Sequence, residues 1–432
     1  MLSVLRFRTY RRLFAAQVVA LTGTGLATVA LGLLAYRLAG PGAGAVLGTA
    51  LAIKMVAYVT VAPLFGAVAG MVPRRALLVG LDVVRAVVAL ALPFVSETWH
   101  VYVLIFLLQS ASATFTPAFQ ATVPDVLEDE ADYTRALTLS RLAYDLETLL
   151  SPSLAALALA LVSFETLFVG TAVGFVGSAL LILSVALPSP AVGRRRPTRG
   201  LRVYLATPRL RGLLAVHLAV AAAGSMVLVN TVVLVRVGLG RDAVDVAFAL
   251  AANGVGSVVA ALCLPGILRR RSDRSVMLQA AGLLVGCLVA GVFVESWSAL
   301  LVLWALMGVG GSLVLTPAAR LLRRSAGSVD RPAVFAADFA LSHLCWLVCY
   351  PLAGGLMTVV GAAVTFGVLG GVAGVALVVA VGVWPRPDVE VIEHSHSGAV
   401  GEEHLRDAVL VGGSWRHSHS YRIDDNHSHW PR

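Results

Sequence analysis

Charged residues are scarce in this sequence of 432 residues. They make up 13% of the chain, whereas 58% of it is hydrophobic, and a soluble domain normally carries about 25% charged residues. Lysine is nearly missing, since Lys54 is the only one. A chain of this length cannot cover a water-exposed surface with so few charges. The composition therefore excludes an ordinary soluble protein and predicts a surface that faces lipid.

Three further absences narrow the function. All four cysteines fall in apolar segments, so no disulfide framework is expected. No Gly-rich phosphate loop ending in Lys-Ser/Thr occurs, and no catalytic constellation is found, so we expect neither ATP hydrolysis nor an enzyme, and no cofactor. The formal charge of +9 comes from arginines in short clusters, which lack the continuous basic face of a nucleic-acid-binding protein.

Long apolar runs dominate what is present. A spanning helix needs about 20 mostly apolar residues, and twelve such segments can be counted. They are residues 13–37, 45–71, 76–96, 99–123, 136–161, 164–187, 210–236, 246–268, 276–294, 297–320, 332–357 and 360–384. We predict an all-α membrane protein of twelve transmembrane helices. The first run is too long for the core of a signal peptide, so we interpret it as an uncleaved span.

Arginine clusters predict the orientation. They lie at residues 6–12, 74–75, 194–202, 269–274 and 320–331, all on one side of twelve spans. The short opposite loops carry almost no lysine or arginine, with Arg241 as the main exception. Because cytoplasmic loops are enriched in basic residues, we predict a multi-pass protein of the bacterial inner membrane with both termini in the cytoplasm.

The two halves of the sequence repeat each other. Phe115-Thr116-Pro117-Ala118 recurs as Leu315-Thr316-Pro317-Ala318, 200 positions later, and Ser151-Pro152-Ser153-Leu154-Ala155-Ala156 resembles Tyr350-Pro351-Leu352-Ala353-Gly354-Gly355. Two repeated halves are typical of secondary transporters. We predict two six-helix halves at residues 1–187 and 210–384, a cytoplasmic linker at 188–209 and a cytoplasmic tail at 385–432.

This plan resembles the major facilitator superfamily. The superfamily's loop signature, Gly-x-x-x-Asp-Arg-x-Gly-Arg-Arg, is matched by Gly66, Arg74 and Arg75, while Gly70 and Met71 replace the Asp and the first Arg. The resemblance implies a secondary transporter in which this loop contributes to gating. The proline-bearing segment at residues 151–156 is similar to the antiporter motif Gly-Pro-x-x-Gly-Gly.

A narrower resemblance concerns the substrate. The segments LFAAQVVALTGTGLATVALGLLAY, ALAIKMVAY and QSASATFTPAFQATVPDVL are similar to a bacterial efflux branch that includes nickel-resistance exporters with histidine-rich cytoplasmic tails. The resemblance implies efflux, and it makes the histidines of this chain candidate metal ligands.

Ionisable residues within spans are candidates for transport and proton coupling. Placing one charged side chain in the bilayer at the centre of an isolated helix costs at least about 2.5–3.5 kcal/mol of free energy. The candidates are Lys54, Asp82, Arg85, Arg141, Asp145, Glu147 and Asp338. Lys54 and the Asp82–Arg85 pair have structural ion pairing as the alternative. For Asp145 and Glu147, near the predicted midplane, we favour exchange of a proton for a cation.

Two groups of residues could bind a transition metal. Asp338, Ser342, Cys345 and Cys349 share one stripe of a helix and could form a pathway, although cysteines in spans also act as small hydrophobic residues. The tail contains His394, His396, His404, His417, His419, His427 and His429. Histidine-rich tracts are compositional metal-binding signals, and alternation with serine puts neighbouring imidazoles on one side of an extended chain. A disordered polar terminus is the alternative.

The most specific hypothesis is a monomeric, proton-coupled exporter of a divalent transition metal such as nickel or cobalt, with the lipid bilayer, protons and substrate as its partners. An exporter of drugs, siderophores or other small organic compounds is the first alternative, which an aromatic content of only 7% disfavours. A non-transporting membrane sensor is the second, and the two-half plan argues against it.

The topology can be tested with reporters. A fluorescent protein fused after Arg432 should fluoresce, and alkaline phosphatase fused there should be inactive, because both ends are expected in the cytoplasm. Fusions in the loop at residues 97–100 serve as the control with the opposite pattern. Phosphatase activity from the C-terminal fusion would contradict the orientation.

Overall fold

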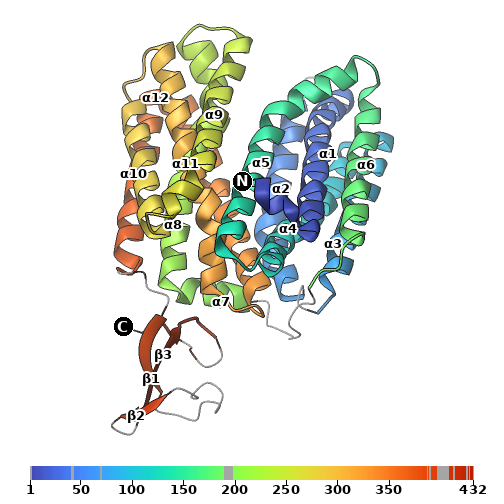
Figure 1. Cartoon of the computed structure of the whole chain (residues 1–432). Coiled ribbons are helices and arrows are strands. Elements are labelled where there is room, and N and C mark those ends of the chain that lie inside the picture. Colours follow the sequence, from blue (N-terminus) through green and yellow to red (C-terminus); the bar gives the residue numbers. More distant parts are fainter. Residues whose placement is uncertain are drawn as a thin grey trace.

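The computed structural model describes residues 2–39, 43–68, 71–188, 198–386, 388, 391–396, 408–411, 414–424, 427 and 429–431. Most of them are helical, and the two halves lie side by side (Figure 1). The ribbons of the halves are close at the end that carries the C-terminal strands and diverge toward the opposite end. We call the former the tail-side end.

The N-terminal half consists of six long helices. After the short 3-10 helix η1 (Leu2–Arg6) come α1 (Arg8–Ala39), α2 (Ala43–Val68), α3 (Arg74–Ala91) with η3 (Leu92–Phe94), α4 (Thr98–Val126), α5 (Glu130–Leu159) and α6 (Phe164–Leu183). Two clusters of buried side chains hold these helices together, one at each end of the half.

The C-terminal half begins inside the predicted linker. A short amphipathic helix, α7 (Arg199–Ala206), precedes α8 (Pro208–Val233) with the π-helical turn η4 (Leu234–Gly238), α9 (Ala243–Leu268), α10 (Asp273–Gly291), α11 (Trp297–Ser325) and α12 (Arg331–Val383). The linker is therefore partly an ordered helix, in which Tyr204 is buried against the core of this half.

Helix α12 contains the last two predicted spans. Its 53 residues are interrupted at Gly361, where φ is 81° and the backbone is not helical. A side chain with a Cβ rarely adopts this conformation, so glycine permits the break. Among the described residues, nine helices are long and apolar enough to cross a membrane, with α12 counted once. With α12 counted as two and with α2 and α5 added, the fold has about twelve helices, as predicted.

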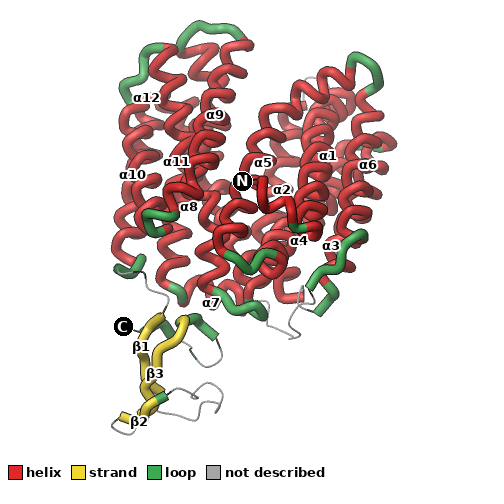
Figure 2. The backbone as a smooth tube through the Cα atoms, in the orientation of Figure 1, coloured by secondary structure: helices red, strands yellow, loops and turns green. Residues whose placement is uncertain are grey.

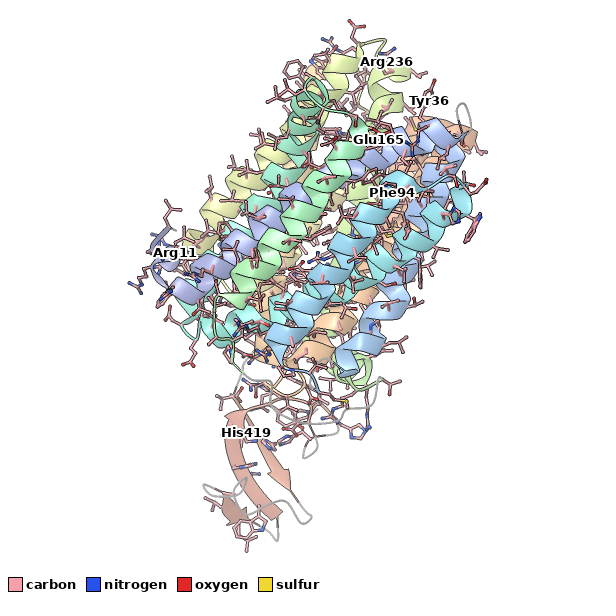
Figure 3. The ribbon with its side chains drawn as sticks, turned by 90° about the vertical axis from the view of Figure 1, so that its right-hand side faces the viewer. Arg11, Tyr36, Phe94, Glu165, Arg236 and His419 are labelled. Atoms are coloured by element: carbon pink, nitrogen blue, oxygen red, sulfur yellow. The ribbon has the colours of Figure 1, made fainter. Side chains whose placement is uncertain are left out.

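The two ends of the bundle differ in charge. The arginine clusters that the structure describes lie at the tail-side end, as the contacts of Arg6 with Asp132, Arg74 with Asp125 and Arg320 with Glu130 show. In Figure 3, Tyr36, Glu165 and Arg236 lie at the opposite end from His419. The predicted grouping of the basic clusters is thus found in the fold.

The tail departs from the all-α prediction. Strands β1 (Val391–His396), β2 (Val409–Val411) and β3 (Ser414–Ser420) form an antiparallel sheet in the order β1-β3-β2, beyond the helices (Figure 2). His394 is opposite His417 in the β1–β3 register. Side chains opposite each other in an antiparallel pair lie on one face of the sheet, so the register brings histidines from distant positions together.

Close helix packing in the C-terminal half depends on two glycines. A Cβ on Gly256 of α9 would overlap the carbonyl oxygen of Ala305 on α11, and one on Gly308 of α11 would overlap the carbonyl oxygen of Asn253. Such small residues let membrane helices approach each other at backbone distance.

We predict that Gly256→Ala lowers the melting temperature of the purified protein by several degrees, because overpacking costs about 1–3 kcal/mol. Gly286→Ala is the matched control, since a Cβ there meets nothing within 4 Å. The control should melt at or slightly above the wild-type temperature. Equal melting temperatures for the two variants would contradict the close α9–α11 contact.

Candidate functional site

A cavity of about 600 Å³ lies mainly within the N-terminal half. All six long helices of that half contribute to its wall, and Leu228 of α8 is the contribution from the other half. Among its lining residues are Gln17, Thr24, Thr28, Lys54, Tyr58, Arg85, Gln109, Tyr144, Glu147 and Ser151. Three of the predicted transport residues, Lys54, Arg85 and Glu147, therefore share one cavity.

The charges in this cavity have different surroundings. The Arg85 guanidinium pairs with Asp82 on the same helix and lies over the rings of Phe115 and Phe175, at 4.0 and 4.5 Å. The ammonium of Lys54 lies 5.5 Å from the ring of Tyr58. Because Asp82 balances Arg85, the remaining charges of the wall are Lys54 and Glu147, which are opposite in sign.

Aromatic rings are more frequent in the wall than the whole-chain composition suggests. Tyr58, Phe115, Phe119, Tyr144 and Phe175 all line the cavity. The hydroxyl of Tyr58 donates to Gln109 Oε1 at 3.0 Å. The low aromatic content of the chain therefore does not describe this cavity, because five aromatic residues are concentrated in its wall.

The predicted pair Arg141–Asp145 joins the two halves. Arg141 lies 3.0 Å from Asp145 on α5, and it also donates to Ser257 Oγ of α9 at 2.8 Å. Ser257 in turn donates to Asp145 Oδ2 at 2.8 Å. Asp145 is thus held at the α5–α9 contact and is not among the residues that line the cavity.

A carboxylate shared by both halves closes the tail-side end. One oxygen of Asp125, at the end of α4, pairs with Arg74 of the same half, and the other pairs with Arg331 at the start of α12. All three side chains are largely buried. Arg75 of the predicted gating loop points to solvent, and Gly66 belongs to α2.

A second network crosses between the halves nearby. Arg320 of α11 contacts Glu130 of α5 at 2.5 Å and Asp273 of α10 at 3.3 Å. Arg323 donates to the carbonyl oxygen of Glu128 at 2.5 Å. Asp125, Glu130 and Asp273 were not among the predicted site residues, because each lies at a helix end and not within an apolar run.

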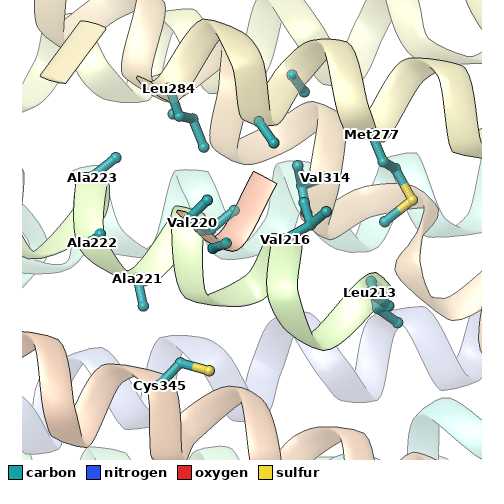
Figure 4. Close-up of a cluster of buried hydrophobic side chains, with 14 of the residues drawn as sticks. Leu213, Val216, Val220, Ala221, Ala222, Ala223, Met277, Leu284, Val314 and Cys345 are labelled. Carbon is teal, nitrogen blue, oxygen red and sulfur yellow. The ribbon is translucent and has the colours of Figure 1, made fainter. Parts of the chain in front are cut away.

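The stripe on α12 faces the interior of the C-terminal half. Asp338 accepts from the hydroxyl of Tyr204 at 2.9 Å and lies 3.3 Å from His217 Nε2. Cys345 and Cys349 are buried in the apolar core; in Figure 4, Cys345 lies beside helix α8 and its buried alanines and valines. The expected metal pathway along the stripe has no support from this placement, because the thiols fill core positions as small apolar side chains do.

The tail brings four histidines together. His394 of β1, His417 and His419 of β3, and His427 lie with their ring centroids 4.5–5.1 Å from a neighbour in the group. The Nε2 atom of His394 is 3.0 Å from that of His417 and 3.0 Å from that of His427. His394, His417 and His419 each offer a ring nitrogen within 4.8 Å of the other two, and no other group of three His, Cys, Asp or Glu with such spacing occurs among the described residues.

The other ring nitrogens explain what this cluster can bind. His394 Nδ1 is 3.0 Å from the carbonyl oxygen of Ile392, and His427 Nδ1 is 2.9 Å from Asp424 Oδ1. These oxygens only accept, so each neutral ring must carry its hydrogen on Nδ1. When both rings are neutral, both Nε2 atoms present a lone pair toward each other, and either a proton on one ring or a metal ion between them makes the contact favourable.

The spacing of the nitrogens fits a transition metal. Two nitrogens that each bind a metal at about 2.0–2.1 Å are about 2.9 Å apart at a right angle and about 3.4 Å apart in a tetrahedron. A carboxylate or carbonyl oxygen behind a ligating imidazole, as found for His427 and His394, is the usual support of such sites. The side chain of His396 and the whole of His404 lie outside the described residues, and His429 is exposed.

The fold and both candidate sites can now be compared with known proteins. The model of the Major Facilitator Superfamily matches residues 13–294 and 239–417, and the chain belongs to this family. It is a membrane transporter by family, not an enzyme. No curated protein matches the sequence.

Solved structures with a similar fold include two transporters. The human organic anion transporter MFSD10 (TETRAN) aligns with a TM-score of 0.74 at 14% identity, covering 86% of this chain and 99% of that one. A bacterial homologue of the iron transporter ferroportin in its outward-facing state aligns with a TM-score of 0.73 at 14% identity, covering 87% and 98%. At this identity the likeness concerns the fold alone.

We predict that Asp125→Asn opens the tail-side end. Spin labels at Ala131→Cys and Ser328→Cys, two exposed positions on opposite halves in a variant without native cysteines, report the separation. Loss of one partner of a buried charge pair costs about 2–5 kcal/mol, so the ratio of open to closed molecules should rise at least tenfold. Glu165→Gln, which breaks an exposed pair within one half, is the control and should leave the distance distribution unchanged.

Proposed function

We propose that this chain is a secondary active exporter of a divalent transition metal, of the nickel or cobalt type, driven by proton antiport across the bacterial inner membrane. In this proposal the tail-side end and both termini face the cytoplasm, since the basic clusters lie at that end. The closed tail-side end then corresponds to an outward-facing state.

The histidine cluster of the tail is the observation that carries the metal hypothesis. Its Nε2 atoms converge at the separation of metal-bound nitrogens, and neutral imidazole is a good ligand for nickel, cobalt, zinc and copper. Asp424 and a backbone carbonyl orient two of the rings. Such an arrangement is expected of a metal site and is not required by a disordered polar terminus.

The cavity supplies the chemistry for coupling. Glu147 is its carboxylate and can carry a proton in one direction and contact a cation in the other. Gln17, Gln109 and Ser151 add neutral oxygen atoms that could replace part of a metal's hydration shell. Lys54 adds a positive charge to the same wall.

A small organic anion is the second candidate substrate. Lys54 and five aromatic rings in one cavity favour an anion with an apolar body, and the arrangement is poorer in metal ligands than the tail. The similar structures do not choose between these candidates, because one is called an organic anion transporter and the other a homologue of an iron transporter.

Growth of an expressing strain on a panel of metals and organic compounds separates the two. Raised tolerance to nickel or cobalt, together with metal-dependent proton release from everted vesicles, would support metal export. Raised tolerance to organic anions with no change in metal tolerance would replace the first candidate with the second.

We predict that Glu147→Gln reduces gradient-driven efflux at least a hundredfold at normal protein levels, because the amide cannot exchange a proton. Asp145→Asn tests the other predicted carboxylate, and Lys54→Arg tests whether a guanidinium can replace the ammonium of Lys54. Glu165→Gln is the matched control at an exposed end. Wild-type efflux in Glu147→Gln, in Asp145→Asn and in the double variant would exclude both carboxylates from the coupling step.

A further inference from the structure

The histidine tail is docked on the helical bundle. Tyr421 and Ile423 are buried in the same apolar cluster as Trp384 at the end of α12. Arg422 Nε donates to the carbonyl oxygen of Arg324 on α11 at 3.3 Å. The ring of Trp430 lies 4.8 Å from the guanidinium of Arg209 on α8. A polar linker that only tethered the histidines would need none of these contacts.

The docking point belongs to the network that closes the tail-side end. Arg324 contacts Asp388, just after α12, at 2.8 Å and Asp273 at 3.5 Å. Asp273 is also 3.3 Å from Arg320, which reaches Glu130 of the N-terminal half. A short series of charged contacts therefore leads from the docked tail to the other half of the transporter.

The docked segment also supplies part of the histidine cluster. His427 and its hydrogen-bond partner Asp424 follow the docked residues directly. The ring of Tyr421 lies 4.6 Å from that of His427 and 4.8 Å from that of His394. An ion bound between His394 of β1 and the histidines of β3 would therefore fix the position of Tyr421, which contacts His394, and of the adjacent Arg422 against α11.

We propose that the cluster of His394, His417 and His419 is a regulatory metal site, separate from the transport cavity, whose occupation stabilises the closed tail-side end. The proposal rests on the proposed function for the identity of the ion as a divalent transition metal. Metal bound in the tail holds the docked segment on Arg324, and this favours the state in which Arg320 bridges to Glu130.

The proposal requires that the two states bind metal differently. An effector shifts an equilibrium only by its difference in affinity for the two states. By linkage, the tail should bind metal more tightly in the closed state than in the open state. The ratio of the two affinities should equal the factor by which saturating metal raises the ratio of closed to open molecules. A tail that only raises the local metal concentration would leave the conformational equilibrium of the bundle unchanged.

The decisive experiment measures closure with and without Ni²⁺ in the full-length protein. The spin-label pair Ala131→Cys and Ser328→Cys reports the tail-side separation in lipid nanodiscs, and equilibrium dialysis measures bound nickel. We expect saturating Ni²⁺ to raise the ratio of closed to open molecules about fivefold or more, the lower range of allosteric coupling. An unchanged distance distribution at full nickel occupancy would overturn the proposal.

Two variants separate metal binding in the tail from its effect on closure of the tail-side end. His394→Ala with His417→Ala should lose tail-bound nickel and the nickel-dependent closure together. Arg422→Ala should still bind nickel but lose most of the closure, because its contact with α11 is gone. Arg416→Ala, which removes an exposed arginine from β3, is the matched control and should respond as the wild type does. A full nickel response in the double histidine variant would overturn the proposal.

The outcomes separate this proposal from the proposed function. Nickel-dependent closure in a protein that exports only organic anions would retain the regulatory site and reject metal as the cargo. Nickel export without nickel-dependent closure would retain the cargo and reject the regulatory site.

Discussion

An ionised side chain away from water needs a counter-charge, and much of the observed arrangement depends on that constraint. Within the N-terminal half it couples Arg85 to Asp82 and Arg141 to Asp145, and the second pair contacts Ser257 of the other half. At the tail-side end it joins the halves through Asp125 and Glu130. Apolar helices make up most of the structure, and these few ion pairs determine which residues of the two halves are in contact.

The two candidate sites have different chemistry and support different parts of the proposed function. The cavity has one carboxylate, one lysine and several aromatic rings, a combination suited to coupling and to a substrate with an apolar part. The tail has imidazoles whose orientation is fixed by oxygens behind them, a combination suited to a metal. Metal recognition and translocation therefore need not use the same residues, and the contacts of Arg324 are where the two could be linked.

The sequence predicted the fold well because length and hydropathy determine where helices cross a bilayer. It also singled out Lys54, Arg85 and Glu147 one by one, because each ionisable group is costly in lipid, but it did not place them in one cavity. It could not predict the roles of Asp125 and Ser257, since Arg331, which contacts Asp125, and Asp145, which contacts Ser257, each lie in the opposite half. The stripe that contains Cys345 and Cys349 shows a second limit of sequence analysis. Helical periodicity predicts which residues share a face of the helix, but it does not predict whether that face lines a cavity or packs in the core. The strands of the tail have a similar explanation, because pairing of β1 with β3 joins segments about 25 residues apart along the chain.

Asp125 has a consequence for the energy of alternating access. Each of its oxygens is bound by an arginine, Arg74 from its own half and Arg331 from the other. When the halves separate, Asp125 stays neutralised by Arg74, and only Arg331 loses a partner, at a helix start that would then be open to water. In the closed state the carboxylate is shared between the two halves. In the open state it remains paired with the N-terminal half alone. Opening thus avoids stranding a lone anion, which would otherwise add several kcal/mol to the barrier.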